Sequence, residues 1–144
     1  MESDIESTFN TSLPPFIRLS PEGFEVGNAK KRFLEVAIYD EQVVRAFWKN
    51  GILRCQSADG LRSLRTGKPC RLCRNQRSCT PRIVLYLLFA EEPYRLALSY
   101  SSSRNYLAYR RELKLKGLTP ADALTRLSLC DHGSWCEVKF QLIM

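Results

Sequence analysis

The chain has 144 residues, 44% of them hydrophobic and 26% charged, with a formal net charge of +7 and a pI of about 9.3. This length predicts one domain with one core, and no apolar stretch approaches the roughly 20 residues that a membrane span needs. The first residues lack a basic n-region and an apolar h-region, so we expect no secretory signal and a reducing cytoplasm. The excess of positive charge favours a polyanionic partner, nucleic acid before a membrane surface.

The first half of the chain contains two stretches with strand periodicity. Residues 1–12 are polar and aperiodic, so we expect a flexible acidic tail followed by a single domain over residues 13–144. Residues 14–19 are expected to form a short edge strand. Alternation over 31–39 and again over 43–49 predicts two further strands. In the second of these, one side carries Val44, Ala46 and Trp48 and the other carries Arg45, Phe47 and Lys49.

Residues 55–81 have a different composition, rich in Cys, Arg, Ser and Gly and poor in large apolar side chains. Such a stretch cannot bury a core of its own, so it needs another source of order. It contains four cysteines, Cys55, Cys70, Cys73 and Cys79. A C-x2-C step lets two thiolates bind one ion from a tight turn, and two more complete the tetrahedral shell of a structural zinc site. We therefore predict a metal-binding insert at 55–81 that holds Zn²⁺.

The chemistry around these cysteines supports metal binding, with other readings left open. Neighbouring arginines lower thiol pKa values and favour the thiolates that metals need. In a reducing compartment cysteines are more often metal ligands than disulfides. The series Cys70 to Cys79 also resembles the iron–sulfur staple of some DNA nucleases, although nothing here resembles their nuclease domain. Unligated surface cysteines are the remaining alternative.

Strand signals resume after the insert, on both sides of a turn at 91–93. Residues 83–89 lead into this turn and residues 94–100 lead out of it. The second of these strands is expected to point three side chains inward, Tyr94, Leu96 and Leu98.

A helix is expected next, over about residues 104–116. The serines at 101–103 can cap its start, and Gly117 suits the C′ position at its end. Three residues at helical spacing are expected to dock it on the strands, Tyr106, Tyr109 and Leu113. Residues 119–122, Thr-Pro-Ala-Asp, have the pattern of a second helix N-terminus.

The chain ends in two predicted strands, 124–130 and 135–143, joined by a turn. Cys130 and Cys136 flank this turn with His132 between them. Three metal ligands on one tight turn make poor geometry, so we expect core or edge cysteines and a polar turn histidine. The inventory is mostly strands, with one clear helix. A mainly β fold, a small OB-like barrel with one helix and the metal-binding insert, fits this inventory, and a generic α+β sheet is the fallback.

An ordered series of residues resembles a known family. It begins with the insert cysteines together with Ser57, Asp59, Gly60 and Arg82, followed by an apolar strand. It continues through Tyr94, Leu96, Leu98, Ser99, Ser102, Tyr106, Tyr109, Leu113, Gly117, Thr125, Leu127 and Leu129. This series, over about residues 43–143, resembles phage- and mobile-element-encoded single-stranded-DNA-binding-like proteins, in which an OB-type barrel carries a zinc-ribbon insert. The stretch from Cys73 to Cys79 is shorter than the family pattern, which bears on Cys79 as the fourth ligand.

The resemblance implies binding rather than catalysis, in a bacterial or phage-infected cell, beside protein partners of a replication, recombination or transposition complex. Single-strand binding needs cations for phosphates and aromatic faces for bases. Strand-alternating positions supply both, in the sets Arg45, Phe47 and Lys49; Arg82 and Tyr86; and Trp135 and Lys139. The insert adds Arg71, Arg74 and Arg77.

We therefore predict a non-enzymatic protein that binds single-stranded DNA, with RNA as the alternative polymer. The carboxylates are scattered and no Gly-rich phosphate loop is present, which argues against an enzyme. Two other functions stay open. One is a zinc-knuckle protein–protein adaptor in transcription or transposition, and the other is an iron–sulfur accessory of a nuclease.

Overall fold

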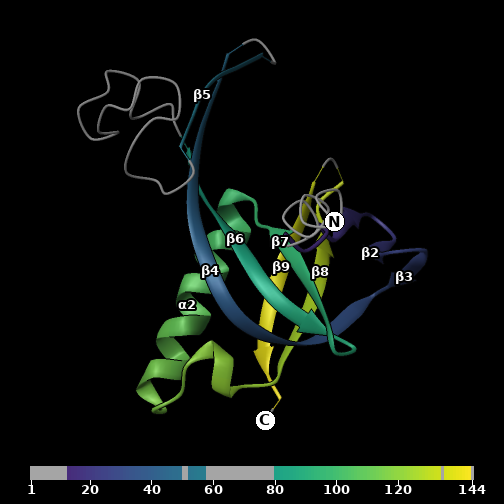
Figure 1. The fold of residues 1–144 in the computed structure, drawn as a ribbon, viewed down its shortest axis with the longest axis vertical. Coiled ribbons are helices and arrows are strands. Elements are labelled where there is room, and N and C mark those ends of the chain that lie inside the picture. Colours follow the sequence, from purple (N-terminus) through teal and green to yellow (C-terminus); the bar gives the residue numbers. More distant parts are fainter. Residues whose placement is uncertain (1–12, 50–51, 58–79, 134, 144) are drawn as a thin grey trace, which may run out of the picture.

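The computed structural model describes residues 13–49, 52–57, 80–133 and 135–143. Within these ranges the fold is mainly β with one α-helix, as predicted (Figure 1). The N-terminal strands are β1 (Arg18–Ser20), β2 (Gly23–Val26) and β3 (Ala29–Lys31). The strands that follow are β4 (Phe33–Lys49), β5 (Ile52–Ser57), β6 (Thr80–Phe89) and β7 (Glu92–Ala97). The chain then forms α2 (Tyr100–Leu115), the short 3-10 helix η2 (Pro120–Asp122), β8 (Thr125–Asp131) and β9 (Cys136–Leu142).

The strands form two antiparallel sheets. The smaller has the order β1-β2-β3, and the larger has the order β7-β6-β4-β8-β9, with β5 also paired to β4. The larger sheet is built on β4, which pairs with β8 over 33–36, with β6 over 37–46 and with β5 over 45–49. Figure 1 shows β4 curving across the molecule, with its distal end and β5 projecting beyond the other strands. A register shift between Ile38 and Asp40 marks a bulge, a feature that bends strands and increases their twist.

The core lies on one face of the larger sheet and follows the predicted alternation. In β4 the residues Leu34, Val36 and Ile38 are buried. From the other elements the same cluster receives Phe24, Leu85, Leu87, Leu96, Leu98, Tyr106, Leu127 and Val138. The inward series of β7 is therefore confirmed, with Tyr94 packed at the edge of the cluster. Tyr109 and Leu113 are also buried, which confirms that α2 docks through the predicted face.

Several boundaries differ from the sequence-based prediction. The two alternating stretches 31–39 and 43–49 are one strand, β4, because the bulge keeps the chain paired with β6 through the break in periodicity. The described residues contain nine strands, against seven stretches predicted as strands. The N-terminal meander β1–β3 supplies most of the excess, and the expected edge strand 14–19 is only partly realised, as β1.

The start of α2 also differs from the prediction. Ser99 is the N-cap, in an extended conformation, and its hydroxyl accepts a hydrogen bond from the Ser102 amide at 3.3 Å. The helix therefore begins at Tyr100, and the serines at 101–103 form its first turn instead of preceding it. At the other end Gly117 has φ +75°, as a C′ glycine requires. The Thr-Pro-Ala-Asp motif forms only η2, a single 3-10 turn, because Ala123 returns to extended backbone.

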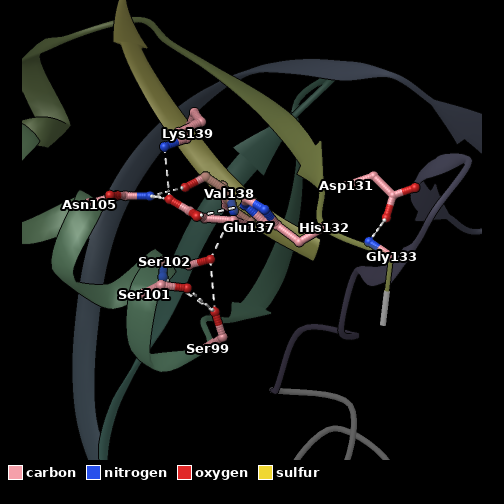
Figure 2. Close-up of polar contacts among 10 residues, drawn as sticks. All are labelled: Ser99, Ser101, Ser102, Asn105, Asp131, His132, Gly133, Glu137, Val138 and Lys139. Carbon is pink, nitrogen blue, oxygen red and sulfur yellow. Dashed lines mark hydrogen bonds and ion pairs between the residues drawn. The ribbon is translucent and has the colours of Figure 1, made fainter. Parts of the chain in front are cut away.

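The first turn of α2 connects an inner strand and an edge strand of the larger sheet, β6 and β9. Where β7 ends, the amide of Ile83 in β6 donates to the Ser103 hydroxyl at 3.1 Å. On β9, the amide of Val138 donates to the Ser102 hydroxyl at 2.8 Å (Figure 2). Both serines are buried, so without them two backbone donors would lack partners inside the protein. The helix thus joins β6 to β9, which the strand order places on opposite sides of β4.

We expect Ser102→Ala and Ser103→Ala each to lower the free energy of unfolding by about 1–3 kcal/mol, because each leaves a buried amide unpaired. Ser101→Ala is the matched control, since the hydroxyl of Ser101 lies only near that of Ser99, at 3.4 Å. Urea denaturation of the three variants measures the difference. Equal stability of all three would show that the two hydrogen bonds do not hold the helix in place.

Candidate nucleic-acid interface

The face of β6 that points away from the core carries polar and aromatic side chains. Alternation buries Ile83, Leu85 and Leu87 and turns Arg82, Tyr86 and Leu88 to the other side, with Val84 buried among them. Arg82 and Tyr86 therefore share a face, as the sequence predicted. Arg82 and Leu88 are exposed, and Tyr86 is half-buried.

A row of side chains crosses this outer face at right angles to the strands. Its members, from the N-terminal segment through β7 and β6 to β4, are Phe16, Arg95, Tyr86 and Tyr39. The Arg95 guanidinium lies 4.0 Å from the centroid of the Phe16 ring. Arg95 is the register partner of Tyr86, whose ring centroid lies 6.3 Å from that of Tyr39. We call these four residues the aromatic row.

Backbone pairing and hydrogen bonds hold the aromatic row in place. The amide of Ile17 donates to the Arg95 carbonyl and the Arg95 amide donates to the Pro15 carbonyl, both at 2.8 Å. The Nε of Arg95 donates to the Pro14 carbonyl at 2.7 Å. The Tyr86 hydroxyl donates to Gln42 Oε1 at 3.0 Å. The Arg95 guanidinium and the Tyr86 ring are therefore held by hydrogen bonds, and the backbone pairing sets the positions of Phe16 and Arg95.

The row is accessible to a ligand. Phe16 is 48% exposed and Tyr39 is 44% exposed, although both are large aromatic side chains. Aromatic rings and arginine planes at the surface are the groups on which unstacked bases pack. Arg82 is exposed on the same face of β6, four residues or about 13 Å from Tyr86. The row can therefore stack bases while Arg82 meets a phosphate farther along the strand.

The pairing of β4 with β6 bears on the other set predicted to bind nucleic acid, which lies at positions 45, 47 and 49 of β4. Arg82 is the register partner of Val44, so positions 45 and 47 are out of phase with Arg82 and Tyr86. In the β4–β5 pairing, Arg45 is opposite Ser57, Phe47 is opposite Cys55 and Lys49 is opposite Ile52. The side chains of Arg45, Phe47 and Lys49 lie outside the described part of the structure, so their proposed role stays a prediction.

The positive charge of the chain is concentrated in one segment of the sequence, between the end of β4 and the start of β6. Ten of the 22 Lys and Arg residues, but only one of the 15 Asp and Glu residues, fall between Arg45 and Arg82. The rest of the chain has twelve basic and fourteen acidic residues, so the whole excess belongs to this segment. We call residues 45–82 the basic arm. Its ends are the projecting end of β4 and the start of β6, which leads to the aromatic row (Figure 1).

The predicted metal site also falls in the basic arm. Cys70, Cys73 and Cys79, like Arg71, Arg74 and Arg77, lie outside the described residues. The backbone of Cys55 belongs to β5, where it is paired with Phe47 of β4. This cysteine therefore lies in a paired strand and not in an irregular insert. Across the described ranges no group of three or more His, Cys, Asp or Glu side chains could hold a metal ion. The metal site therefore remains a prediction about the arm.

The β8–β9 hairpin carries a second polar cluster, around Glu137. His132 Nε2 lies 3.0 Å from Glu137 Oε1, and its ring stacks on Trp135 with centroids 4.2 Å apart. Trp135 precedes β9, so the predicted strand starts one residue too early. Cys130 and Cys136 are free thiols whose register partners are Glu137 and Asp131, which places them on opposite faces of the hairpin.

Glu137 is buried, and both of its carboxylate oxygens have polar partners. Its Oε2 accepts hydrogen bonds from Asn105 Nδ2 at 2.6 Å and from Lys139 Nζ at 2.8 Å (Figure 2). The hydrogen bonds from Lys139 and Asn105 lower the pKa of Glu137 from 4.5 to about 2. The partner carboxylate in turn raises the pKa of Lys139. Lys139, a predicted phosphate contact, therefore has its charge balanced within the protein.

Sequence reasoning missed three of the four residues of the aromatic row. Tyr39 was at the edge of a recognised strand, Phe16 was in a presumed edge strand, and Arg95 lay between inward-pointing residues. Each of the three alternates with buried apolar neighbours in its own segment, and this pattern predicts that its side chain is exposed. Their meeting depends on pairing between segments about 80 residues apart, and alternation within one strand contains no information about that pairing.

Comparisons with protein-family models, with curated proteins and with solved structures found no match for this chain. None of the described helices is long and apolar enough to cross a membrane. The features that bear on function are the geometry of the aromatic row and of the β8–β9 hairpin, together with the sequence of the basic arm.

The low pKa of Glu137 predicts a specific pH dependence of stability. A carboxyl group with a lowered folded-state pKa stabilises the fold fully above its ordinary pKa of 4.5, and this contribution is lost as the pH falls towards 2. Glu137→Gln should therefore flatten the stability profile between about pH 4.5 and 2, measured by thermal denaturation. Glu112→Gln, on the exposed side of α2, is the control. Superimposable profiles for Glu137→Gln and the native chain would contradict the assigned hydrogen bonds.

Proposed function

We propose that the chain is a non-enzymatic, single-stranded nucleic-acid-binding protein of the replication or recombination type. The observation that carries the proposal is the aromatic row, in which two exposed rings, a half-buried ring and a guanidinium are held in one line across three strands and the N-terminal segment. Bases of a single strand can stack on such a line, whereas the bases of a duplex are already stacked on each other. Arg82 and the basic arm supply the cations for the phosphates.

We further propose that the larger sheet is an OB-like barrel. Numbered along the chain without β5, its strands β4, β6, β7, β8 and β9 have the order 3-2-1-4-5. OB barrels have five strands, are often partly open, and bind oligonucleotides on strands 2 and 3 and on the loops that join strands 1–2 and 4–5. Here these elements are the outer face of β6 and β7, the basic arm, and the hairpin with Trp135. The first turn of α2 would then complete the barrel by joining β6 to β9.

The proposal includes a structural Zn²⁺ in the basic arm, held by Cys55, Cys70, Cys73 and Cys79. The arm is short of large apolar side chains, and a tetrahedral thiolate site would order it. Ordering matters for function because a fixed array of arginines loses less conformational entropy on binding phosphates than a loose one. The metal therefore has a structural role in this proposal and takes no part in a reaction.

The ligand is proposed as single-stranded DNA, with RNA as the polymer to be compared. Proteins that bind single strands through stacking show little sequence preference, because every base has a π face. Their affinity depends steeply on salt, with a log–log slope of about −0.7 per phosphate neutralised. These two properties separate this function from a protein–protein adaptor, which would show neither.

Tyr39→Ala and Phe16→Ala should each weaken binding to a random single-stranded oligonucleotide by about 1–3 kcal/mol, because each removes a stacking surface. The salt dependence should change little, since neither residue is charged. Fluorescence anisotropy over a series of salt concentrations measures both quantities.

Phe33→Ala is the matched control for Phe16. Phe33 is 52% exposed and also lies under an arginine, Arg126, at 4.9 Å, but that arginine is ion-paired to Glu35 and stands at the other end of β4. Its replacement should leave affinity within about 0.5 kcal/mol. Equal losses of affinity for Phe33→Ala and Phe16→Ala would show that the aromatic row is not the binding site. Absence of binding by the native chain would overturn the proposed function.

The zinc proposal predicts one metal ion per chain by elemental analysis of anaerobically purified protein. Cys70→Ser or Cys73→Ser should release it, because each removes one ligand of the tetrahedral shell. Cys130→Ser and Cys136→Ser are the controls and should keep full metal content. Detection of iron and acid-labile sulfide would show that the cofactor is an iron–sulfur cluster and not zinc. Loss of metal in either control would mean that the fourth ligand is not Cys79.

A further inference from the structure

The outward side of α2 carries an unusual set of residues. The helix packs inward through Tyr106, Tyr109 and Leu113, and Figure 1 shows it along one flank of the molecule. A helix turns by 100° per residue, so the side diametrically opposite these residues is a line of exposed positions. This line consists of Tyr100, Arg104, Leu107, Ala108, Arg111 and Leu115. We call it the outer stripe of α2.

Three large apolar side chains on this line are exposed to solvent. Tyr100 is 53% exposed, Leu107 is 37% exposed and Leu115 is 85% exposed. The side of a helix opposite the core normally carries charged and polar residues. The spacing of the three residues, seven and then eight positions, keeps them within a sector of about 80° over the whole length of the helix. That regularity distinguishes the stripe from single apolar residues scattered on a surface.

Cations alternate with these apolar residues and form no ion pair with the part of the chain that the structure describes. Arg104 and Arg111 stand between the apolar positions, and Lys114 and Lys116 lie near the C-terminal end. Among the described residues none of these four forms an ion pair, and Arg104 contacts only the Tyr100 ring, at 5.9 Å. Arg110, by contrast, lies off the stripe and is paired with Glu41.

We propose that the outer stripe of α2 is a docking site for an acidic, amphipathic segment of a partner protein. Apolar residues of that segment would cover Leu107 and Leu115, and its carboxylates would pair with Arg104 and Arg111. A segment that places leucines or other apolar residues three and four positions apart, with acidic residues between them, fits this alternation. The inference is independent of nucleic-acid binding, because the aromatic row lies on other elements.

The composition of the stripe favours this partner over the other occupants that positive charge would attract. A nucleic-acid strand would use the arginines but would gain little from the two leucines, which offer no ring for stacking. A second copy of the chain would bring one stripe of unpaired cations against another, which costs free energy. Only an acidic partner with apolar residues satisfies both features.

The test uses a synthetic helical peptide of about 16 residues, matched to the length of α2, with leucine and glutamate alternating along one face. Titration into the ¹⁵N-labelled full chain should shift amide resonances along Tyr100–Leu115. A control peptide with glutamine for every glutamate should bind at least about tenfold more weakly, since it removes the charge pairing. Leu115→Ala and the double variant Arg104→Gln, Arg111→Gln should each weaken binding of the acidic peptide by about tenfold.

Leu88→Ala is the matched control, because Leu88 is an exposed leucine on the sheet and not on the stripe. It should leave peptide binding unchanged, and none of the α2 variants should alter the affinity for single-stranded DNA. No shift on α2 at millimolar peptide would overturn the proposal. So would three other results: loss of DNA affinity in the arginine variant without peptide binding, binding of anionic phosphatidylglycerol vesicles through the stripe alone, or self-association abolished by Leu115→Ala.

Discussion

Two hydrogen bonds to serines in the first turn of α2 link the two halves of the large sheet. Ser103 satisfies the Ile83 amide where β7 leaves β6, and Ser102 satisfies the Val138 amide on β9. The two amides belong to strands on opposite sides of β4, so adjacent serines of one helical turn fix the distance between them. Tyr106 then enters the core one turn later, with its hydroxyl donating to Glu41 of β4 at 2.8 Å. The curvature of β4 and the position of α2 are therefore linked.

This arrangement explains why one face of the sheet is free. The helix and the N-terminal meander both pack on the core side, through Tyr106 and Phe24 among others. On the outer side of β6, Arg82 and Leu88 stay exposed and Tyr86 is half-buried. The N-terminal segment returns only to the edge of β7, where it adds Phe16 beside Arg95. The same packing that builds the core thus presents the aromatic row to solvent.

Charge and aromatic residues are distributed over different parts of the chain, and the proposed function needs both. The basic arm carries the whole excess of positive charge, whereas the aromatic row lies on strands of balanced charge. Long-range attraction by the arm and short-range stacking on the row are separate contributions, with different dependence on salt. The β8–β9 hairpin differs from both, because the charge of Lys139 is balanced by Glu137 and its tryptophan rests on His132.

Local patterns in the sequence were enough to predict the strands with strong alternation, the docking face of α2, the glycine that ends it and the mainly β class, because these depend on spacing within one segment. The same patterns located the arm, its cysteines and its arginines. Other features emerge only from the folded chain: 31–39 and 43–49 are one strand, Ser99 caps α2, and the aromatic row forms. These outcomes depend on which segments pair and in what register, and pairing is a property of the whole chain that no local pattern records.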